Sequence, residues 1–252
     1  MFAEERKVKI LEIVNSNYRI EVSDLTEELQ VSESTIRRDL QDLEQAGLLK
    51  RTHGGAVKLE TTSFEPTMDE KELVNIEEKM EIGKKAAAFI QDNDTIILDA
   101  GTTTLQIAKN IQAKNVTVLT NSILIALALS KNKDVDVVVT GGHIRKEILS
   151  IVGPITDRII GQFSVDKAFI GANGITIKEG CTTPNIEEAH TKNRMIQSAK
   201  EVYVVADHSK FGKVSFARIA AIDEIDGIIT SKGIERSIIE QYKSKNIRLI
   251  YN

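Results

Sequence analysis

Hydrophobic residues along the first 47 positions recur every three or four residues, a spacing that predicts three short helices. Ser23 and Ser32 are expected to cap the second and third helices, and Gly47 is expected to end the third. Two strand-like runs, LLKRT and AVKLE, follow and are joined by a His-Gly-Gly turn, which is typical of a hairpin. We therefore expect a first domain over residues 1–57 that consists of three helices and a small hairpin.

Residues 58–75 are polar, contain Pro66 and show little hydrophobic periodicity, which predicts a linker. From residue 76 to residue 252, short runs rich in valine and isoleucine alternate with helical patterns. The strand-like runs lie at residues 95–100, 116–120, 135–140, 166–172, 201–207, 227–230 and 248–251. Near-continuous hydrophobic strands separated by helices indicate a parallel sheet that is covered on both faces. The expected fold class is α/β, with the small helical domain followed by a larger parallel-sheet domain of Rossmann type.

The composition argues against several classes of protein. With 33 Lys and Arg against 37 Asp and Glu, the formal net charge is −4, which argues against indiscriminate binding of polyanions but permits a local basic patch. The single cysteine, Cys181, forms no disulfide within one chain and fits a reducing cytoplasm. No hydrophobic run is long enough to predict a membrane span. The four histidines make no zinc-binding spacing with the cysteine, so we expect no metal.

The third predicted helix separates hydrophobic from polar residues. Ile36, Leu40 and Leu43 form one hydrophobic stripe on a helical wheel. The opposite side carries side chains that hydrogen-bond to base edges and phosphates, namely Ser34, Arg37, Arg38, Gln41 and Gln45. Arginine suits such contacts because its planar fork matches guanine and phosphate. The Ser32 cap leaves backbone N–H groups and the positive end of the helix beside Thr35, where a phosphate can bind.

The second predicted helix is separated from the third by only about two residues, which is the spacing of a helix-turn-helix motif. The hairpin holds Lys50, Arg51 and His53 at its edge, like a wing over the DNA backbone. Together these features predict a winged helix-turn-helix whose third helix enters the major groove of double-stranded DNA. The candidate DNA-binding residues are Ser32, Ser34, Thr35, Arg37, Arg38, Gln41, Lys50, Arg51 and His53.

Charge alone favours a simpler interpretation, in which the arginines only form the solvent-exposed face of a surface helix and have no role in binding. Residues 1–58 contain nine Lys and Arg against eleven Asp and Glu, so the first domain is not basic overall. Asp39, Asp42 and Glu44 could also pair with the arginines. The combination of helix spacing, capping, polar face and Gly-Gly wing favours DNA binding over that interpretation.

The segments STIRRDL and HGGA, with the helices before them, closely resemble the N-terminal signature of the DeoR family of bacterial transcriptional regulators. The resemblance implies that Thr35, Arg37 and Arg38 contact operator DNA and that the wing approaches the adjacent groove. It also favours repression of an operon for carbohydrate use, relieved by a sugar phosphate. The residues themselves specify neither the sign of regulation nor the operator sequence.

Polar turns follow most of the predicted strands of the second domain. Gly101, Thr102, Thr103 and Thr104 begin a helix directly after a strand, and backbone N–H groups and hydroxyls at such a place can hold a phosphate. The loop matches neither the dinucleotide-binding nor the ATP-binding glycine motif, so we expect a small phosphorylated ligand and no cofactor. An ordinary helix cap is the alternative explanation for the threonines. Because the ligand crevice of an open α/β sheet lies at the carboxyl ends of its strands, the other turns can converge there.

The segments DAGTTT, VLTNS, TGG, DKAFIGANGI and VADHSKFG resemble the sensor domain of DeoR-family regulators, which is itself similar to ribose-5-phosphate isomerase. The resemblance implies a phosphorylated sugar as effector, with its phosphate at residues 101–104 and its hydroxyls near Asp99, Asn173 and Glu187. The candidate effector-binding residues are Asp99, Gly101, Thr102, Thr103, Thr104, Asn121, Gly141, Gly142, Lys167, Asn173, Glu187, Asp207 and Lys210. The particular sugar stays open among fructose 1-phosphate, glycerol 3-phosphate and the tagatose phosphates.

The alternative function is a sugar-phosphate isomerase that carries an accessory DNA-binding domain. Isomerisation needs a carboxylate that moves a proton between adjacent carbons. The turn that matches the isomerase's Gly-Ala-Asp-Glu reads Gly-Ala-Asn-Gly at residues 171–174, and Lys192 lies near the place of an isomerase glutamate. We therefore expect a sensor without catalytic residues, although Glu187 and Glu188 are close enough in sequence to substitute. A third class, an architectural DNA-binding protein, leaves the polar strand ends without a role.

The expected partners follow from the DNA-binding mode. Regulators with one recognition helix per chain dimerise, so that two helices meet successive major-groove faces. We expect a homodimer or homotetramer in the cytoplasm that is assembled through the larger domain, with operator DNA and a phosphorylated sugar as partners and no membrane. Ligand binding is expected to change the relative orientation of the DNA-binding units through the linker.

Overall fold

The computed structural model describes residues 2–17, 19–52, 54–58, 65 and 67–251. The chain divides into two compact units, residues 1–74 and residues 75–252. Within the described ranges, no helix is long and hydrophobic enough to cross a membrane.

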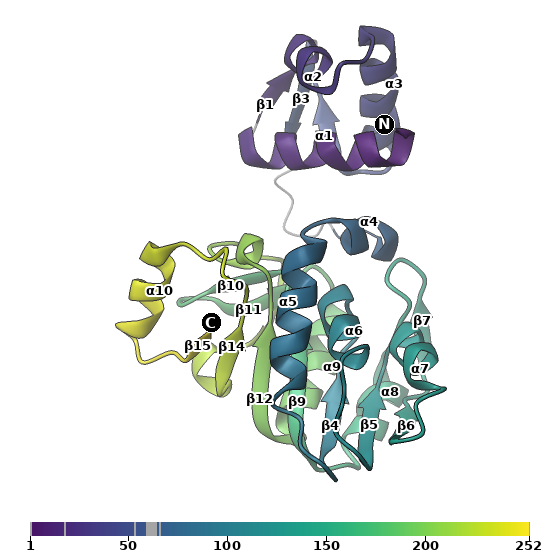
Figure 1. Cartoon of the computed structure of the whole chain (residues 1–252), viewed down its shortest axis with the longest axis vertical. Coiled ribbons are helices and arrows are strands. Elements are labelled where there is room, and N and C mark those ends of the chain that lie inside the picture. The colour runs from purple at the N-terminus through teal and green to yellow at the C-terminus, as the bar shows by residue number, and fades with distance from the viewer. Residues whose placement is uncertain (1, 18, 53, 59–64, 66, 252) are drawn as a thin grey trace. The chain divides into compact units, whose positions relative to one another are not determined.

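The first unit combines helices with a three-stranded antiparallel sheet (Figure 1). Its elements are α1 (Ala3–Asn17), β1 (Arg19–Glu21), α2 (Val22–Leu29), α3 (Glu33–Gln45), β2 (Leu49–Arg51), β3 (Gly55–Lys58) and α4 (Met68–Leu73). The sheet order is β1-β3-β2. Buried residues from the first three helices hold the unit together, among them Ile10, Val14, Leu25, Ile36 and Leu40. The three predicted helices and the hairpin strands are confirmed.

The two predicted helix caps have different outcomes. Ser32 caps α3 as predicted, because its hydroxyl accepts a hydrogen bond from the backbone N–H of Thr35. Ser23 is not a cap, since α2 begins one residue earlier, at Val22, directly after the end of β1. The strand runs straight into the helix, and the backbone N–H of Val22 donates to the carbonyl of Gly54 at 2.8 Å. The serine therefore lies inside the first turn and caps nothing.

The predicted end of α3 is confirmed, and the predicted linker contains a helix that was not expected. Gly47 follows the last residues of α3 with φ of 71°, a left-handed conformation that glycine adopts without strain, so the predicted stop is confirmed. The range predicted as a linker, residues 58–75, contains the short helix α4. A helix of six residues is too short for hydrophobic periodicity to predict it.

The second unit is built on a seven-stranded parallel sheet with the order β15-β14-β12-β9-β4-β5-β6 (Figure 1). Its strands are β4 (Thr95–Leu98), β5 (Val116–Thr120), β6 (Val135–Val139), β9 (Val165–Gly171), β12 (Ala199–Val205), β14 (Gly227–Ile229) and β15 (Leu249–Ile250). Each neighbouring pair is parallel. These strands are the seven predicted runs, so the α/β fold with a parallel sheet is confirmed.

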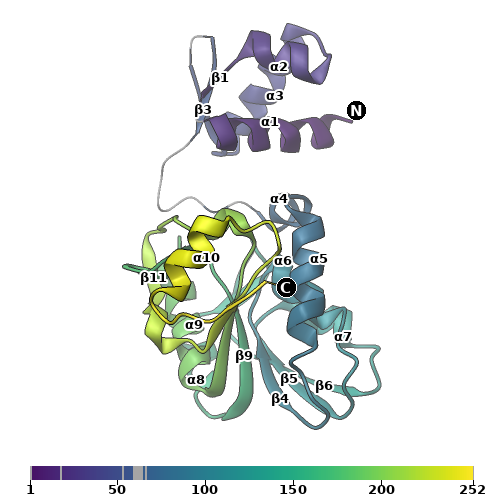
Figure 2. The same cartoon turned by 60° about the vertical axis from the view of Figure 1, so that its left-hand side comes forward.

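Helices cover both faces of this sheet (Figure 2). Along β4, Ile96 and Leu98 join one hydrophobic cluster while Ile97 joins the other, as strand geometry requires. The first cluster includes residues of α5 (Ile76–Ala87), α6 (Thr102–Ala108) and α7 (Ile123–Leu129). The second includes residues of α8 (Pro154–Ile160), α9 (Ile186–Gln197) and α10 (Arg236–Lys243). The buried sheet therefore fixes the positions of the strand ends.

Short elements that the sequence did not predict surround the main sheet. They are a hairpin of β7 (His143–Arg145) and β8 (Ser150–Val152), and an antiparallel sheet of β10 (Gly174–Thr176), β11 (Gly180–Thr183) and β13 (Ala217–Ala220). Two 3-10 turns, η1 (His208–Lys210) and η2 (Ile222–Glu224), complete the second unit. Strands of three or four residues carry too few positions for alternation to be recognised.

Candidate DNA-binding and ligand-binding sites

The outer face of α3 carries the predicted polar residues. Ile36, Leu40 and Leu43 are buried, whereas Ser34, Arg37, Arg38 and Gln41 are exposed. At the start of the helix, the hydroxyl of Ser32 lies 2.9 Å from that of Ser34 and 2.8 Å from that of Thr35. The amphipathic pattern is therefore confirmed, and its polar side faces solvent.

The two adjacent arginines differ in their surroundings. Arg37 forms an exposed ion pair with Glu33, one turn earlier, at 2.5 Å from Nη2. Arg38 makes no hydrogen bond or ion pair with any other residue that the structure describes. An exposed pair at this spacing contributes only about 0.3–0.5 kcal/mol, so both guanidinium groups are available to a stronger anionic partner.

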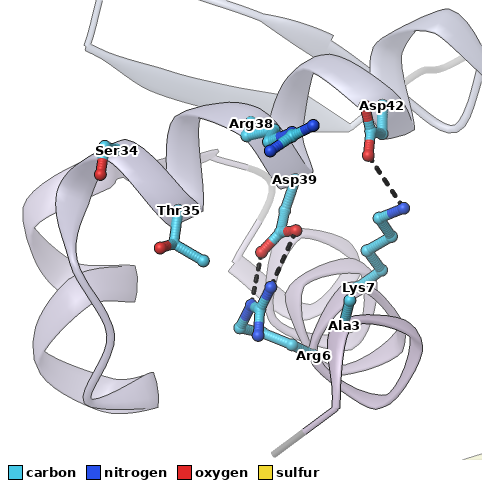
Figure 3. A pocket seen from close by; sticks show the side chains of 8 residues that line it. All are labelled: Ala3, Arg6, Lys7, Ser34, Thr35, Arg38, Asp39 and Asp42. Atoms are coloured by element: carbon cyan, nitrogen blue, oxygen red, sulfur yellow. Dashed lines mark hydrogen bonds and ion pairs between the residues drawn. The ribbon is translucent and has the colours of Figure 1, made fainter.

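The other acidic residues of α3, Asp39, Asp42 and Glu44, do not pair with these arginines. Asp39 is buried and forms a two-point ion pair with Arg6 of α1, and Asp42 pairs with Lys7 of α1 at 2.9 Å (Figure 3). Glu44 accepts a hydrogen bond at 2.8 Å from the backbone N–H of Arg51 in the hairpin. The alternative that these three carboxylates pair with Arg37 and Arg38 is therefore wrong.

The hairpin presents fewer free cations than predicted. Lys50 is exposed on β2, whereas Arg51 is half-buried and lies 3.9 Å from Glu44. His53 lies outside the described residues. Gln41 and Lys50 thus keep exposed side chains, while the guanidinium of Arg51 already has a carboxylate nearby.

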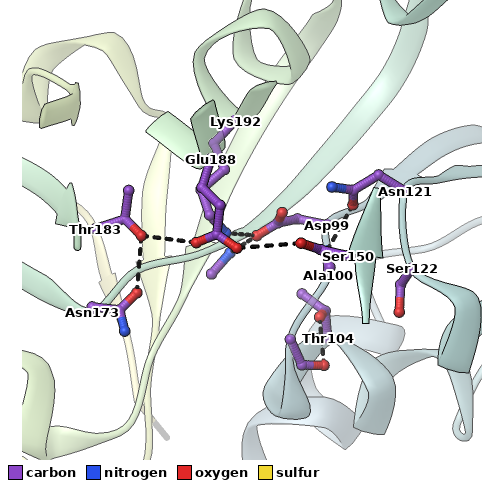
Figure 4. A network of polar contacts seen from close by, with 12 residues as sticks. Asp99, Ala100, Thr104, Asn121, Ser122, Ser150, Asn173, Thr183, Glu188 and Lys192 are labelled. Carbon is purple, nitrogen blue, oxygen red and sulfur yellow. Dashed lines mark hydrogen bonds and ion pairs between the residues drawn. The ribbon is translucent and has the colours of Figure 1, made fainter. Parts of the chain in front are cut away.

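In the second unit, several predicted residues meet at the carboxyl ends of the strands (Figure 4). Asp99 follows β4, and its carboxylate accepts a hydrogen bond from the backbone N–H of Gly171 at the end of β9, at 2.9 Å. Asn121 follows β5, and its Oδ1 accepts from the backbone N–H of Ala100 at 2.9 Å. The parallel sheet therefore brings the ends of β4, β5 and β9 together, as its topology requires.

Two buried ion pairs occupy the centre of this cluster. Lys192 of α9 contacts the carboxylate of Asp99, and both side chains are almost completely buried. Arg145 of β7 lies 2.9 Å from Glu188 of α9. The cluster therefore carries cations and carboxylates in matched pairs.

Hydroxyl groups complete the contacts of Glu188. The hydroxyl of Ser150 donates to its carboxylate at 3.3 Å, and the hydroxyl of Thr183 lies 3.1 Å from it. The same threonine hydroxyl lies 3.2 Å from Oδ1 of Asn173, a predicted residue (Figure 4). Asn173 is thereby joined to the cluster.

The glutamate of α9 that joins this cluster is Glu188 and not the predicted Glu187. Glu187 is exposed, whereas its neighbour Glu188 is buried and faces the strand ends. Asn185 caps the helix by accepting a hydrogen bond from the backbone N–H of Glu188 at 3.0 Å. Residues 188, 192 and 195 lie on one helical face, and the buried Met195 marks that face as the inner one. A helical wheel anchored on that methionine would have identified Glu188 and Lys192.

The Gly-Thr-Thr-Thr turn begins α6 as predicted. Thr102 and Thr104 are buried, and Thr103 is half-buried. The hydroxyl of Thr104 donates to the carbonyl of Gly101 at 3.0 Å, which is an ordinary contact within a helix start. Thr103 is thus the threonine of the turn whose side chain is accessible.

Asp207 and Lys210 lie on the loop after β12. The carboxylate of Asp207 accepts hydrogen bonds from the backbone N–H of Ser209 at 3.0 Å and from the side-chain amide of Asn75 at 3.1 Å. Burial alone would raise the pKa of Asp207, but the charges of Lys210 and Lys79 and the hydrogen bonds from Ser209 outweigh burial and lower the pKa. Lys79, a buried lysine of α5 that the sequence analysis did not select, therefore contributes to the charge of this region.

The glycines after β6 have a structural explanation. A side chain at Gly142 would lie 2.1 Å from the hydroxyl of Thr156, and its φ of 144° also excludes other residues. The carbonyl of Gly141 accepts a hydrogen bond from the same hydroxyl at 2.7 Å. The close contact and the φ angle account for glycine at 142 without a ligand, whereas the hydrogen bond at Gly141 uses only its backbone carbonyl.

Lys167 does not join the other predicted residues. It lies near the amino end of β9, opposite Ile96 of β4, and its Nζ is 2.8 Å from the carboxylate of Asp94. The polar cluster lies at the opposite end of the strands. The placement of Lys167 therefore argues against an effector contact, and we do not retain it as a candidate.

No group of side chains suited to a metal ion occurs among the described residues.

Comparisons with known proteins match both units. The DeoR-like helix-turn-helix domain matches residues 6–62, and the DeoR C terminal sensor domain matches residues 74–232. The chain is 36% identical to the uncharacterized HTH-type transcriptional regulator YulB of Bacillus subtilis, over 99% of this chain and 96% of the relative. It is 38% identical to the HTH-type transcriptional repressor GlcR of the same organism, over 98% of this chain and 100% of the relative.

Among solved structures, ribose 5-phosphate isomerase A of Methanocaldococcus jannaschii shows 17% identity over 54% of this chain and 55% of that chain, with a TM-score of 0.40. Similarity at this level carries no argument about chemistry.

Proposed function

The chain belongs to the DeoR family of helix-turn-helix transcriptional regulators, and from that premise we propose that it represses an operon for carbohydrate use and leaves its operator when a phosphorylated sugar binds. Two features support the proposal. One is the exposed polar face of α3, on which Arg38 has no partner among the described residues. The other is the buried polar cluster at the strand ends of the second unit. A relative named as a repressor supports the negative sign of regulation.

The proposed operator contacts are the exposed residues of α3 together with its capped start. Arg38 and Arg37 supply planar forks for guanine or phosphate, and Gln41 supplies an amide for a base edge. Ser32, Ser34 and Thr35 supply hydroxyls beside the positive end of the helix, which suits a backbone phosphate. Lys50 of the hairpin adds a cation for the adjacent backbone.

The proposed effector contacts lie at the carboxyl ends of the strands. We assign the phosphate to the turn at residues 101–104, where Thr103 is accessible, with Lys79 and Lys210 as candidate cations. We assign the sugar hydroxyls to Asp99, Asn173 and Glu188, the last in place of Glu187. Carboxylates accept hydrogen bonds from neighbouring hydroxyls, an amide both accepts and donates them, and the ion pairs beside them supply alternative partners.

The same cluster supports a sensor in preference to an isomerase. An isomerase base needs a carboxylate with an accessible lone pair and a pKa near neutrality. Asp99 is held by Lys192 and by the backbone N–H of Gly171, and Glu188 is held by Arg145 and two hydroxyls. These contacts occupy the carboxylate oxygens and hold both side chains in fixed positions. Turnover of a pentose phosphate at roughly 1 s⁻¹ or above would contradict the assignment as a sensor.

The transmission from ligand to DNA is proposed to begin at Asn75, the first residue of the second unit. Its side-chain amide holds Asp207, which is a proposed effector residue. Glu78, one turn later on α5, lies 2.7 Å from His208 and accepts a hydrogen bond from Ser231. A ligand that draws Asp207 away from Asn75 would therefore release the chain segment that leads to the DNA-binding unit. Coupling of about 1–3 kcal/mol changes operator affinity by roughly 5- to 150-fold.

We further propose a homodimer or homotetramer in the cytoplasm. One recognition helix per chain gives modest specificity, and two copies reach successive faces of the major groove. A regulator also acts where its operator is, which places it with the chromosome.

The decisive experiment pairs ligand screening with DNA binding. A thermal-shift screen against fructose 1-phosphate, glycerol 3-phosphate and the tagatose phosphates should give one compound that raises the melting temperature, because a ligand stabilises the state that it binds. The same compound should weaken binding to DNA from upstream of the protein's own operon. A protein that ignores this DNA at moderate salt, under every ligand condition, would contradict the proposed function.

A further inference from the structure

A buried ion pair joins α1 to the inner face of α3. Asp39 lies among the buried residues of α3, although its neighbour Arg38 is exposed. The Nε of Arg6 lies 2.5 Å from one carboxylate oxygen of Asp39, and its Nη2 lies 3.1 Å from the other. The side chains are 11% and 5% exposed, respectively. The planar guanidinium thus meets the planar carboxylate at two points, which fixes their mutual orientation.

A second ion pair, more exposed than the first, lies one turn further along α3. Lys7, the next residue of α1, lies 2.9 Å from Asp42 (Figure 3). Hydrogen bonding to Asp42 raises the pKa of Lys7. The two pairs connect consecutive residues of α1 to residues three apart on α3. Such a connection resists rotation of α3 about its own axis.

These pairs border the face that is proposed to contact DNA. Arg6, Lys7, Asp39 and Asp42 line a hollow of about 590 Å³ that Ala3 and three candidate DNA-binding residues, Ser34, Thr35 and Arg38, also line (Figure 3). The guanidinium of Arg6 is occupied by Asp39 and nearly buried, so Arg6 is not itself a free phosphate contact.

A contribution to the stability of the fold is a weak explanation for the presence of a buried ion pair. Desolvation of the two charges offsets most of their attraction, and hydrophobic pairs of similar volume are often as stable or more stable. A hydrophobic pair, however, leaves the rotation of a helix poorly defined, whereas a two-point pair permits one orientation. Side chains extend about 5 Å from the helix axis, so a rotation of about 20° displaces them by about 2 Å. That displacement exceeds the tolerance of a hydrogen bond to a base edge.

We propose that Arg6 and Asp39, supported by Lys7 and Asp42, are positioning residues that set the rotation of α3 and thereby the sequence specificity of DNA binding. They act through Arg38 and Ser34 and touch no base themselves. The inference rests on the proposed role of α3 in operator recognition. It follows that replacing the buried pair lowers sequence specificity and leaves the nonspecific affinity for DNA nearly unchanged. The exposed charges that attract DNA stay in place in such a variant.

The test uses the full-length protein and a duplex that the unmodified protein enriches from a random-sequence library. The double variant Arg6→Met/Asp39→Leu replaces the buried pair with hydrophobic side chains and leaves the net charge unchanged. Affinities for the enriched duplex and for a scrambled duplex are measured at one salt concentration. We expect the affinity for the scrambled duplex to stay within about 2-fold, and the ratio of the two affinities to fall by roughly 10-fold or more, as for loss of one well-placed base contact.

Two further variants keep the test decisive. Arg6→Lys retains the charge but not the two-point geometry, so it should fold and still lower the ratio of affinities. The matched control, Arg236→Met/Glu240→Leu, removes an exposed pair on α10 and should leave the ratio unchanged. Melting temperatures of all variants report whether they fold.

The outcomes distinguish the inference from the proposed function. Variants that fold and keep the full ratio would overturn the positioning role while leaving operator recognition intact. An unmodified protein that enriches no sequence would contradict operator recognition, and the positioning role with it, because there would be no specificity to set.

Discussion

The outer face of α3 in the first unit and the strand-end cluster in the second unit differ in the exposure of their charged side chains. In the first unit, Asp39 turns inward to Arg6, while Arg38 stays exposed on the outer face of α3. In the second unit, both signs are buried together at the strand ends, where Lys192 contacts Asp99. The outer face of α3 therefore presents positive charge to solvent, whereas the strand-end cluster neutralises its charges internally.

The difference corresponds to two kinds of partner. An exposed positive surface attracts a long polyanion through solvent and needs no rearrangement, which makes binding fast and sensitive to salt. A buried and neutralised cluster accepts a charged ligand only by exchanging one existing partner for another. A ligand without matching groups leaves buried charges unpaired and is rejected. The proposed specificity of the sensor thus follows from the burial of its ion pairs.

The largest expected effect tests the buried side of the comparison. Lys192→Met leaves the carboxylate of Asp99 buried without its cation, so we expect a loss of about 3–5 kcal/mol of stability. The double variant Asp99→Asn/Lys192→Met removes both charges of this pair and should recover much of that loss. Scanning calorimetry measures both, with Lys178→Met, at an exposed pair, as the control. A single variant as stable as the double variant would contradict the burial argument.

The exposed side of the comparison predicts an effect on DNA alone. Arg37→Ala with Arg38→Ala should abolish specific operator binding, because each well-placed arginine fork contributes about 1–3 kcal/mol of discrimination. The melting of the second unit should not change. Fluorescence anisotropy with labelled duplex measures binding, and Arg236→Ala on α10 is the control. Specific binding that survives in the double variant would remove α3 from the recognition surface.

A smaller effect is expected at the first residue of the second unit. Asn75 has φ of 53°, which glycine tolerates, so Asn75→Gly removes the hydrogen bond to Asp207 without backbone strain. We expect the effector to bind but to release operator less well, with a loss of about 1 kcal/mol of coupling or roughly 5-fold. Operator titrations with and without effector measure this difference.

The matched control for that variant is Asn246→Gly, which has a similar φ of 59°. Unchanged coupling in Asn75→Gly, with normal effector binding, would show that the signal leaves the sensor by another route.

The smallest effect concerns the threonine turn. Thr103→Val removes one accessible hydroxyl and should weaken effector binding by roughly 2- to 10-fold, the range for one neutral hydrogen bond. Operator binding without effector should not change. Calorimetric titration with the best compound from the thermal-shift screen measures the effect, and the reverse pattern, with DNA binding altered and effector binding intact, would contradict the assignment.

The sequence predicted those elements in which nearly every residue indicates the same secondary structure. The seven sheet strands are rich in valine and isoleucine because most of the sheet is buried on both faces, as Ile96 and Ile97 illustrate. The capped, amphipathic α3 carries several independent signals at once, so its residues were assigned correctly to the buried and exposed sides.

The remaining features depend on tertiary contacts that no local pattern encodes. Arg6 and Asp39 are 33 residues apart, and their pairing follows from the packing of α1 on α3. Glu188 was passed over for Glu187 because adjacent residues of a helix point about 100° apart and only the packed structure selects one. Lys167 belonged to a recognised motif, but its position within the strand decides which end of the sheet it reaches.

The ion pair between Lys167 and Asp94 has a consequence for genetics. It ties the amino ends of β9 and β4, far from the candidate effector contacts at the opposite strand ends. A mutant screen for derepressed colonies would therefore be expected to recover alleles at Lys167 beside those that impair sensing. Such alleles would reduce the amount of folded repressor in the cell, and raised expression would mask them.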